Sequence, residues 1–294
     1  MTSFDPVWLE RQYNARASIP EHPEIFERWA RASALARDKS VCQIDLRYGG
    51  GPNETLDVFV PRVESAPILV FIHGGYWRSL DKRDVSFVAP SFIQDGAMVV
   101  VPNYALCPSV TIDQIALQLV NSLAWVYRNA AAYGADRNRI VVAGHSAGGH
   151  LTAMLLSCLW RKVAADLPAD LVKSALSISG LFDLDPLRHT PFLKDDLRLT
   201  EASARRLSPA YYPAPKGVLN ATVGALESEE FLRQNELIRV RWGTAAVPVC
   251  ERIPATNHLN VLHDFADSNG RLHQLAVQLL GLAQPRKASA VAAA

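Results

Sequence analysis

The amino-acid sequence predicts an α/β fold in which a mostly parallel central sheet carries helices on both faces. Short apolar runs rich in β-branched residues alternate with longer segments whose apolar residues recur at helical spacing. Several of the short runs are apolar at every position, which is typical of parallel strands that are covered on both faces. The chain has 294 residues, of which 49% are hydrophobic. This length is sufficient for one large domain with a full core.

Seven apolar segments are predicted to be the strands of this sheet. In chain order they are 54–60, 67–73, 97–104, 139–144, 175–180, 218–224 and 249–253. Two other segments carry apolar residues at i, i+3, i+4 and i+7 positions, which form one face of a helix. They are residues 111–134, where Gly134 supplies a C-terminal stop, and residues 271–281.

The N-terminal segment has a different pattern. Residues 1–40 are helical in character, rich in aromatic residues and interrupted near Pro20 and Pro23. We expect this segment to lie over the edge or the mouth of the sheet as a partial lid. The chain then divides into a lid segment (1–40), an α/β domain (41–284) and a tail (285–294), which is expected to be disordered because it has nothing to pack.

The charge of the chain excludes two classes of partner. With 30 basic and 29 acidic side chains, the net charge is +1, which provides no electrostatic footprint for nucleic acid or for an anionic membrane surface. No apolar stretch reaches the ~18–20 residues that span a bilayer, and charged residues interrupt the N-terminus where a signal peptide would be apolar. We therefore expect a cytoplasmic protein that binds neither nucleic acid nor membrane, and a homodimer stays open.

Neither a metal nor a cofactor is expected. The chain has four cysteines, which are widely separated and form no C-x-x-C pair: Cys42, Cys107, Cys158 and Cys250. A zinc site or a disulfide framework would need closer spacing. The histidine and aspartate clusters of metal-dependent amidohydrolases, such as H-x-H, are absent from the sequence as well.

The stretch "VVAGHSAGGH" (141–150) contains a G-x-S-x-G pattern centred on Ser146. It directly follows a predicted strand and directly precedes a helix-compatible run. In this context a serine sits on a sharp turn that lifts its hydroxyl off the sheet and places it at a helix N-terminus. We therefore predict that Ser146 is a nucleophile; the alternative is a glycine-rich turn with an idle serine.

A serine nucleophile requires a base and, behind the base, an acid. Of the eight histidines, His258 lies in a loop just after the last predicted strand, where this architecture places the base. The acid should follow the strand before that, and Glu227 is the carboxylate nearest the end of 218–224. Asp183, which follows the strand 175–180, remains the alternative acid.

The stretch "FIHGGYW" (71–77) contains two consecutive glycines. An oxyanion hole at this position would account for them. Acyl transfer develops negative charge on an oxygen, which two or three N–H groups must stabilise. We predict these donors to be the backbone N–H groups of Ala147, Gly74 and Gly75, since glycines allow a close approach of the backbone. Three residues are expected to wall the substrate pocket: Tyr76, Trp77 and His145.

From about Val41 onward, the chain resembles the α/β-hydrolase superfamily on these residues. The H-G-G-x and G-x-S-x-G pair is similar to the hormone-sensitive-lipase-like esterase branch, although Tyr76 stands where that branch usually has a third glycine. The stretches "HGGYW", "NYALCP", "GHSAGGHL", "LESEEF", "NHLNV" and the N-terminal "QYNAR" together resemble the kynurenine formamidase (arylformamidase) group. Two positions depart from that group: Glu227 stands where its acid is commonly aspartate, and Asn257 stands where aspartate often precedes the histidine.

This resemblance implies a serine hydrolase that cleaves N-formyl-kynurenine to kynurenine and formate through an acyl-enzyme, as part of tryptophan catabolism. Ser146, Glu227 and His258 would be its triad, and the N-terminal aromatics would cover the aryl leaving group. The alternative is a carboxylesterase of short-chain acyl esters, which would use the same machinery and differ only in the pocket. A binding module without catalysis would be expected to lose the serine or the histidine.

Overall fold

The structure, a computed structural model, describes residues 5–282. The predicted tail (285–294) lies outside the described residues. Within these residues, eight strands form one sheet in the order β1-β2-β4-β3-β5-β6-β7-β8. The strands are β1 (Cys42–Arg47), β2 (Thr55–Phe59), β3 (Ala66–Ile72), β4 (Met98–Pro102), β5 (Ala135–His145), β6 (Ser174–Ile178), β7 (Val218–Gly224) and β8 (Cys250–Ile253). β2 pairs antiparallel with β1 and with β4, and the other pairings are parallel.

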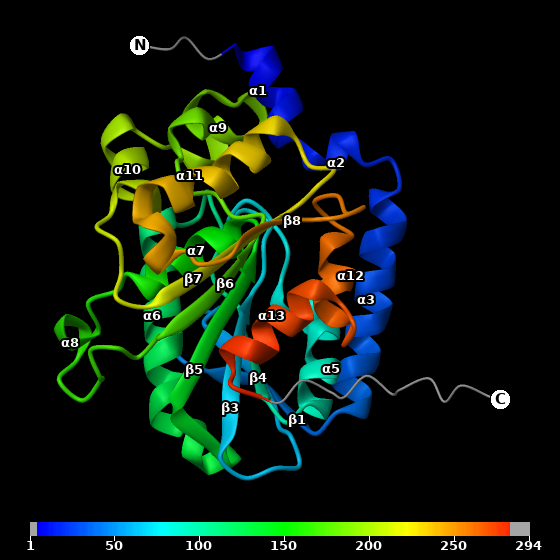
Figure 1. The fold of residues 1–294 in the computed structure, drawn as a ribbon, viewed down its shortest axis with the longest axis vertical. Coiled ribbons are helices and arrows are strands. Elements are labelled where there is room, and N and C mark those ends of the chain that lie inside the picture. The colour runs from blue at the N-terminus through cyan, green and yellow to red at the C-terminus, as the bar shows by residue number, and fades with distance from the viewer. Residues whose placement is uncertain (1–4, 283–294) are drawn as a thin grey trace.

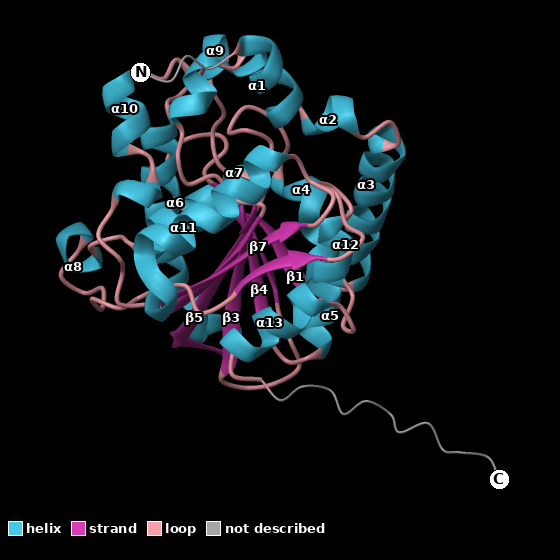
Figure 2. Ribbon diagram, turned by 45° about the horizontal axis from the view of Figure 1, so that its top comes forward, coloured by secondary structure: helices cyan, strands magenta, loops and turns pink. Residues whose placement is uncertain are grey.

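Helices surround this sheet on both faces, as the sequence predicts (Figures 1 and 2). The α-helices are α1 (Pro6–Tyr13), α2 (Ala15–Ser18), α3 (His22–Lys39), α4 (Lys82–Val85), α5 (Ala89–Gln94), α6 (Ile112–Asn129), α7 (Ala147–Leu156), α8 (Trp160–Val163), α9 (Pro191–Leu197), α10 (Glu201–Arg206), α11 (Glu229–Ala246), α12 (Val261–Ala266) and α13 (Arg271–Leu279). Short 3₁₀ turns are η1 (Ser86–Val88), η2 (Ala130–Tyr133), η3 (Asp185–His189) and η4 (Pro209–Tyr211).

The central strands are apolar on both sides because each side meets its own hydrophobic cluster. Along β3, Ile68, Val70 and Ile72 belong to one cluster, together with residues of α6 and α7. The alternate residues Leu69 and Phe71 belong to a second cluster, which includes residues of α3, α5, α12 and α13. All seven residues of β3 are buried. This is the burial that uninterrupted apolar runs predict for parallel strands.

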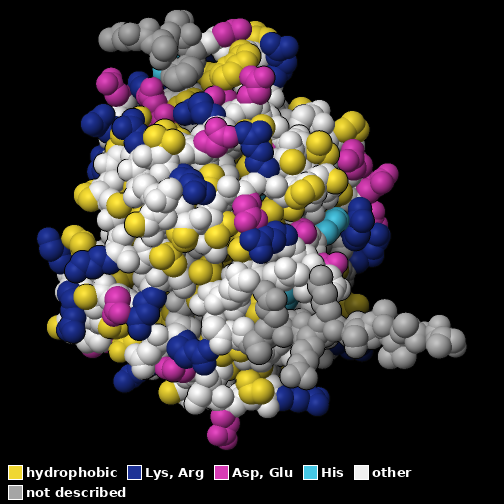
Figure 3. Space-filling view, viewed as in Figure 1, with side chains coloured by type: hydrophobic (Ala, Val, Ile, Leu, Met, Phe, Trp, Pro, Cys, Tyr) yellow, Lys and Arg dark blue, Asp and Glu magenta, His cyan; other side chains and the backbone are white. Residues whose placement is uncertain are grey.

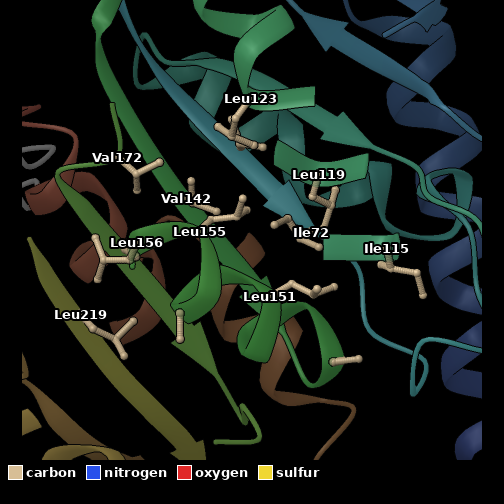
Figure 4. Packing of buried hydrophobic residues seen from close by; sticks show 14 of the residues in the cluster. Ile72, Ile115, Leu119, Leu123, Val142, Leu151, Leu155, Leu156, Val172 and Leu219 are labelled. Carbon is tan, nitrogen blue, oxygen red and sulfur yellow. The ribbon is translucent and has the colours of Figure 1, made fainter. Parts of the chain in front are cut away.

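Helix α6 shows how the sequence pattern becomes packing. Its apolar residues at helical spacing, among them Ile115, Leu119 and Leu123, are buried and face α7 and the sheet (Figure 4). Thr111 caps the N-terminus in a capping box with Gln114. The helix gives way to η2, and the chain turns at Gly134 with a φ of 74°, where the stop was predicted.

Strand β1 was not predicted. It lies at the edge of the sheet, and most of the residues in "CQIDLR" are exposed. An edge strand that faces solvent carries no apolar run, so the hydrophobic pattern misses it. Strand β5 likewise begins earlier than predicted, at Ala135, because its first residues are polar and mostly exposed.

Residues 5–39 fold into α1, α2 and α3 and cross the mouth of the sheet. Figure 1 shows α1 beside α9 and α11, whereas α3 runs down the opposite side of the molecule beside α12. Side chains fasten the α1 end. The Tyr13 hydroxyl donates to Glu230 Oε2 at 2.5 Å, and Ser228 Oγ donates to the Gln12 carbonyl at 2.6 Å. The N-terminal segment is therefore hydrogen-bonded to the start of α11, more than 200 residues later.

The surface is consistent with the small net charge. On the face seen in Figure 3, side chains of both signs are interspersed rather than gathered into a field of one sign. Within residues 5–282, no helix combines the length and the apolar character that crossing a membrane requires.

The buried hydrogen bond of Tyr13 predicts a stability difference. The Tyr13→Phe variant removes a hydroxyl that donates to Glu230 and accepts from Gln234 Nε2. We expect the free energy of unfolding to fall by about 1–3 kcal/mol, since a buried carboxylate loses a donor. The control is Tyr133→Phe, whose hydroxyl makes an exposed contact of 3.4 Å with Gln43; it should stay within about 0.5 kcal/mol of the parent. Urea unfolding measures the free energy of unfolding of both variants. Equal values for the two would contradict a stabilising role of the Tyr13 hydrogen bond.

Candidate active site

Ser146 lies on the sharp turn between β5 and α7. Its backbone has φ 57° and ψ −118°, a left-handed conformation that is rare for a residue other than glycine. The N–H of Ser146 donates to the carbonyl of Ile178 at 2.8 Å, which ties the turn to β6. Gly148 is required on the helix side, because a Cβ there would lie 2.1 Å from the carbonyl oxygen of Ile72. The turn thus places the serine hydroxyl at the N-terminus of α7, as the sequence predicts.

His258 and Glu227 lie next to Ser146 in a chain of hydrogen bonds. The Ser146 hydroxyl is 3.1 Å from His258 Nε2, and His258 Nδ1 donates to Glu227 Oε2 at 2.6 Å. His258 lies in the loop after β8, and Glu227 lies in the loop after β7. The structure therefore brings together the three residues that the sequence analysis selected as nucleophile, base and acid.

The Glu227 carboxylate is held in a defined orientation. Its side chain has no exposed surface, and its second oxygen accepts hydrogen bonds from Ser179 Oγ and from the N–H of Gly224, the latter at 2.7 Å. These donors fix the carboxylate so that one oxygen faces the imidazole. Ser179 was not singled out from the sequence, where it is one hydroxyl among many at strand ends.

Asp183, the alternative acid, lies elsewhere. Its carboxylate accepts from the N–H of Asp185 at 3.2 Å and lies 3.9 Å from Arg233 Nη1. Burial raises the pKa of Asp183 above its usual range. Asp183 is thus held near the start of α11 by its own neighbours, while Glu227 occupies the place beside His258.

His145 supports His258 from the side. Its Nε2 lies 2.7 Å from the carbonyl oxygen of His258, and the two rings are 4.7 Å apart. Burial, together with the adjacent His258, lowers the pKa of His145 well below its usual value. A neutral ring that donates through Nε2 fits this contact. Phe231 also packs against His258, with ring centroids 4.4 Å apart, so the imidazole contacts two neighbouring rings.

The loop after β3 has an unusual backbone. Gly75, Tyr76 and Trp77 follow one another with φ values of 98°, 51° and 55°. At Gly75 a side chain is impossible, because a Cβ would lie 2.2 Å from the carbonyl oxygen of Ser79. That loop is closed by the N–H of Ser79, which donates to the Gly75 carbonyl at 3.0 Å.

The glycines of this loop lie against the serine. A Cβ at Gly74 would be 3.0 Å from the Cβ of Ser146, so the backbone of Gly74 approaches the nucleophile directly. Ala147 is the first residue of α7, and its N–H therefore has no partner within the helix. Among the hydrogen bonds of the described residues, none uses the N–H of Gly75 or of Ala147 as donor. Gly74 and Ala147 thus lie directly beside Ser146, and Gly75 lines the same cavity as Ser146.

The prediction for Trp77 as a wall of the substrate pocket was wrong. Trp77 is completely buried in the core and packs edge-to-face on His150, with ring centroids 5.0 Å apart. The hydroxyl of Tyr76 donates to the carbonyl of Tyr13 at 2.6 Å, and the Tyr76 ring packs edge-on against Phe192. The rings of Tyr76 and Trp77 meet edge-to-face, with centroids 6.4 Å apart. The positive φ values of this loop are a backbone property that the residue types do not reveal.

A cavity of about 390 Å³ opens onto Ser146 and His258. Tyr76 and His145, which the sequence analysis placed in a substrate pocket, line this cavity, and the N-terminal segment contributes several further residues. The lining residues outside the triad come from six segments of the chain: Asn14, Ala15, Arg16, Phe26 and Trp29; Gly75, Tyr76, Arg78, Ser79 and Leu80; Cys107 and Pro108; His145; Phe192 and Asp196; and Leu259. Within residues 5–282, no group of three or more potential ligands is arranged to hold a metal ion.

Comparisons with known proteins identify a family and relatives of this chain. Residues 56–166 match the family described as BD-FAE. The chain is 31% identical over 288 residues to a kynurenine formamidase of Danio rerio, covering 93% of this chain and 96% of that protein. Among solved structures, a candidate thioesterase of Silicibacter sp. TM1040 is 30% identical with a TM-score of 0.78, covering 90% of this chain and 97% of that one.

A more distant structural neighbour extends the likeness of the fold. The esterase of Pyrobaculum calidifontis is 19% identical with a TM-score of 0.66, covering 96% of this chain and 100% of that one. At this identity the likeness concerns the fold alone. Together with the eight-stranded sheet, these neighbours confirm the α/β-hydrolase fold that the resemblance implied.

Proposed function

The chain belongs to the kynurenine formamidase family, and from this premise we propose that it hydrolyses N-formyl-kynurenine to kynurenine and formate by a serine mechanism. That the protein is a hydrolase of esters or amides follows from its family. One observation carries the finer proposal: the hydrogen-bonded chain Ser146–His258–Glu227 lies at a cavity with an aromatic wall. Such a reaction would belong to tryptophan catabolism.

In the first half of the proposed reaction, His258 Nε2 takes the proton of Ser146 as Oγ attacks the formyl carbon. The carbonyl oxygen becomes an oxyanion, which accepts hydrogen bonds from the N–H groups of Ala147 and of Gly74 or Gly75. Glu227 stabilises the imidazolium through Nδ1. His258 then gives its proton to the leaving nitrogen, the C–N bond breaks, and the aryl amine departs from the formyl-enzyme.

In the second half, a water molecule takes the place of the amine. His258 removes a proton from this water, whose oxygen attacks the formyl carbon, and the same donors stabilise the second oxyanion. Collapse breaks the bond to Ser146 Oγ, which recovers its proton from His258, and formate leaves. One water is consumed for each amide bond cleaved.

The aromatic wall supports an aryl leaving group. Phe26 and Trp29 of the N-terminal segment, with Tyr76 and Phe192, provide flat apolar surfaces within the cavity. An aryl amine also leaves more readily than an alkyl amine, because its nitrogen lone pair is delocalised into the ring. In this proposal the predicted lid segment acts as a fixed wall, since Tyr76 and Ser228 both bond to the backbone of residues 12–13.

The nucleophile is tested by substitution and by labelling. The Ser146→Ala variant should lose ~10⁴–10⁶ of kcat on N-formyl-kynurenine, because no other group can form the acyl-enzyme. A fluorophosphonate should add its mass to a peptide containing Ser146 in the parent and to none in the variant. Ser157→Ala, at the other end of α7, is the matched control and should keep activity. A folded Ser146→Ala protein with parental turnover would refute the serine mechanism.

The acid is tested by comparing two carboxylates. Glu227→Gln should lower kcat/KM by several orders of magnitude, about 10⁴ in related triads, because an amide does not stabilise the imidazolium. Asp183→Asn should lower it far less, since Asp183 bonds within its own loop. Steady-state rates with N-formyl-kynurenine decide between them, and the reverse ranking would transfer the role to Asp183.

The substrate is tested by two series with one preparation. We expect the rate on p-nitrophenyl esters to fall from acetyl to hexanoyl, because a formamidase needs room for the smallest acyl group only. Aryl leaving groups should be preferred to alkyl ones, with N-formyl-kynurenine turned over efficiently. If hexanoyl or octanoyl esters are the best substrates and N-formyl-kynurenine is inert, the protein is instead a general carboxylesterase.

A further inference from the structure

The cavity above Ser146 has an excess of positive charge. Its charged lining residues are Arg16, Arg78 and Asp196. Arg78 forms an ion pair with Asp196 and is neutralised by it. Among the arginines and carboxylates of the lining, one positive charge remains, and it belongs to Arg16. The catalytic chemistry described above has no use for this charge.

Arg16 has neutral partners only. Its Nη2 donates to Ser79 Oγ at 3.3 Å, and its guanidinium lies over the ring of Phe26, 4.8 Å from the centroid. Among residues 5–282, no carboxylate lies within ion-pair distance of Arg16. Partial burial, followed by the positive charge of Arg78, lowers the pKa of Arg16 from its usual value, and the negative charge of Asp84 opposes this shift.

The guanidinium of Arg16 is linked through Ser79 to the loop beside the nucleophile. Ser79 Oγ, which accepts from Arg16, also donates to the carbonyl of Gly75 in the loop beside the nucleophile. The backbone of Arg16 belongs to α2, and the side chain of Asn14 caps the N-terminus of this helix. A guanidinium carries five N–H donors in a planar fork, and the contact with Ser79 uses one Nη atom, so the fork retains donors for a bidentate acceptor.

We propose that Arg16 binds a carboxylate on the leaving-group part of the substrate, so that the cavity selects acylated aromatic amines or esters that carry such a group. Carboxylate oxygens match the guanidinium fork in geometry and complete the charge balance of the cavity wall. Phe26 and Trp29 line the same cavity and would contact the aromatic part of such a substrate. The inference rests on the proposed function in using the same cavity and the same nucleophile.

Arg78 does not provide an equivalent site. Its Nη1 bonds to Asp196 Oδ2, and its guanidinium lies 5.5 Å from the ring centroid of Phe192. A second carboxylate at Arg78 would have to share the guanidinium with Asp196 and meet its negative charge. The uncompensated Arg16 is therefore the favoured anchor of the two.

Two matched pairs of substrates test the assignment. One pair is N-formyl-kynurenine and its carboxamide, and the other is 3-acetoxybenzoate and 3-acetoxybenzamide; within each pair, only the charge of the leaving group differs. The measured quantity is the ratio of kcat/KM for the charged over the neutral member. In Arg16→Gln this ratio should fall about tenfold. This is the lower end of the effect expected for a hydrogen bond between charged groups, because Arg16 is partly exposed. The change should come through KM, and Arg16→Lys should restore part of it.

The control is Arg31→Gln. Arg31 carries the same charge on α3, outside the cavity, where it pairs with Glu27 in an exposed i, i+4 contact. This variant should leave the ratio at the parental value in both pairs. An equal fall in Arg16→Gln and Arg31→Gln would show a general field effect and overturn the assignment.

The two pairs separate this inference from the proposed function. If N-formyl-kynurenine is not hydrolysed but the ester pair keeps an Arg16-dependent ratio, the formamidase proposal fails and the role of Arg16 stands. If both pairs are hydrolysed and Arg16→Gln leaves their ratios unchanged, the role of Arg16 is overturned and the formamidase proposal stands.

Discussion

The left-handed backbone of Ser146 is the constraint on which the site depends. A non-glycine residue with φ 57° carries strain of about 1–3 kcal/mol, and it persists only where the surroundings leave no other choice. Here β5 lies at the centre of the sheet between β3 and β6, the N–H of Ser146 is tied to Ile178, and α7 can approach β3 because Gly148 has no side chain. The sheet therefore holds the nucleophile in a position that the local sequence would not adopt alone.

The same sheet determines where the partners of Ser146 arrive. Parallel strands end at one edge, so the loops after β3, β5, β7 and β8 meet although they are far apart in the chain. Each loop contributes one part of the proposed machinery: glycine backbone, nucleophile, acid and base. Ser179, after β6, also has a positive φ of 52° and bonds to Glu227. Rigid strands thus position short loops, and this pre-organisation is what acyl transfer requires.

Much of the fold and of the candidate site follows from the sequence, because buried parallel strands are apolar and Ser146, Glu227 and His258 each follow one of them. The features that could not be predicted from the sequence each have a physical reason. Strand β1 is polar because it is an edge. Trp77 turns into the core because of backbone angles that no residue type encodes. The partners of Tyr13 lie more than 200 residues away, and nothing in the local pattern of residues 1–40 announces them.

The attachment of the N-terminal segment has a consequence for synthesis on the ribosome. Tyr13 and Gln12 emerge before their partners Glu230 and Ser228, which lie 217 and 216 residues further along. At about 5–20 residues per second, the first helix waits on the order of 10–40 s before its binding surface exists. During that interval the aromatic rings of residues 5–39 have no cavity to line. The nascent chain therefore completes the wall of the cavity beside Ser146 with a segment made long before, after nearly all of the sheet has been synthesised.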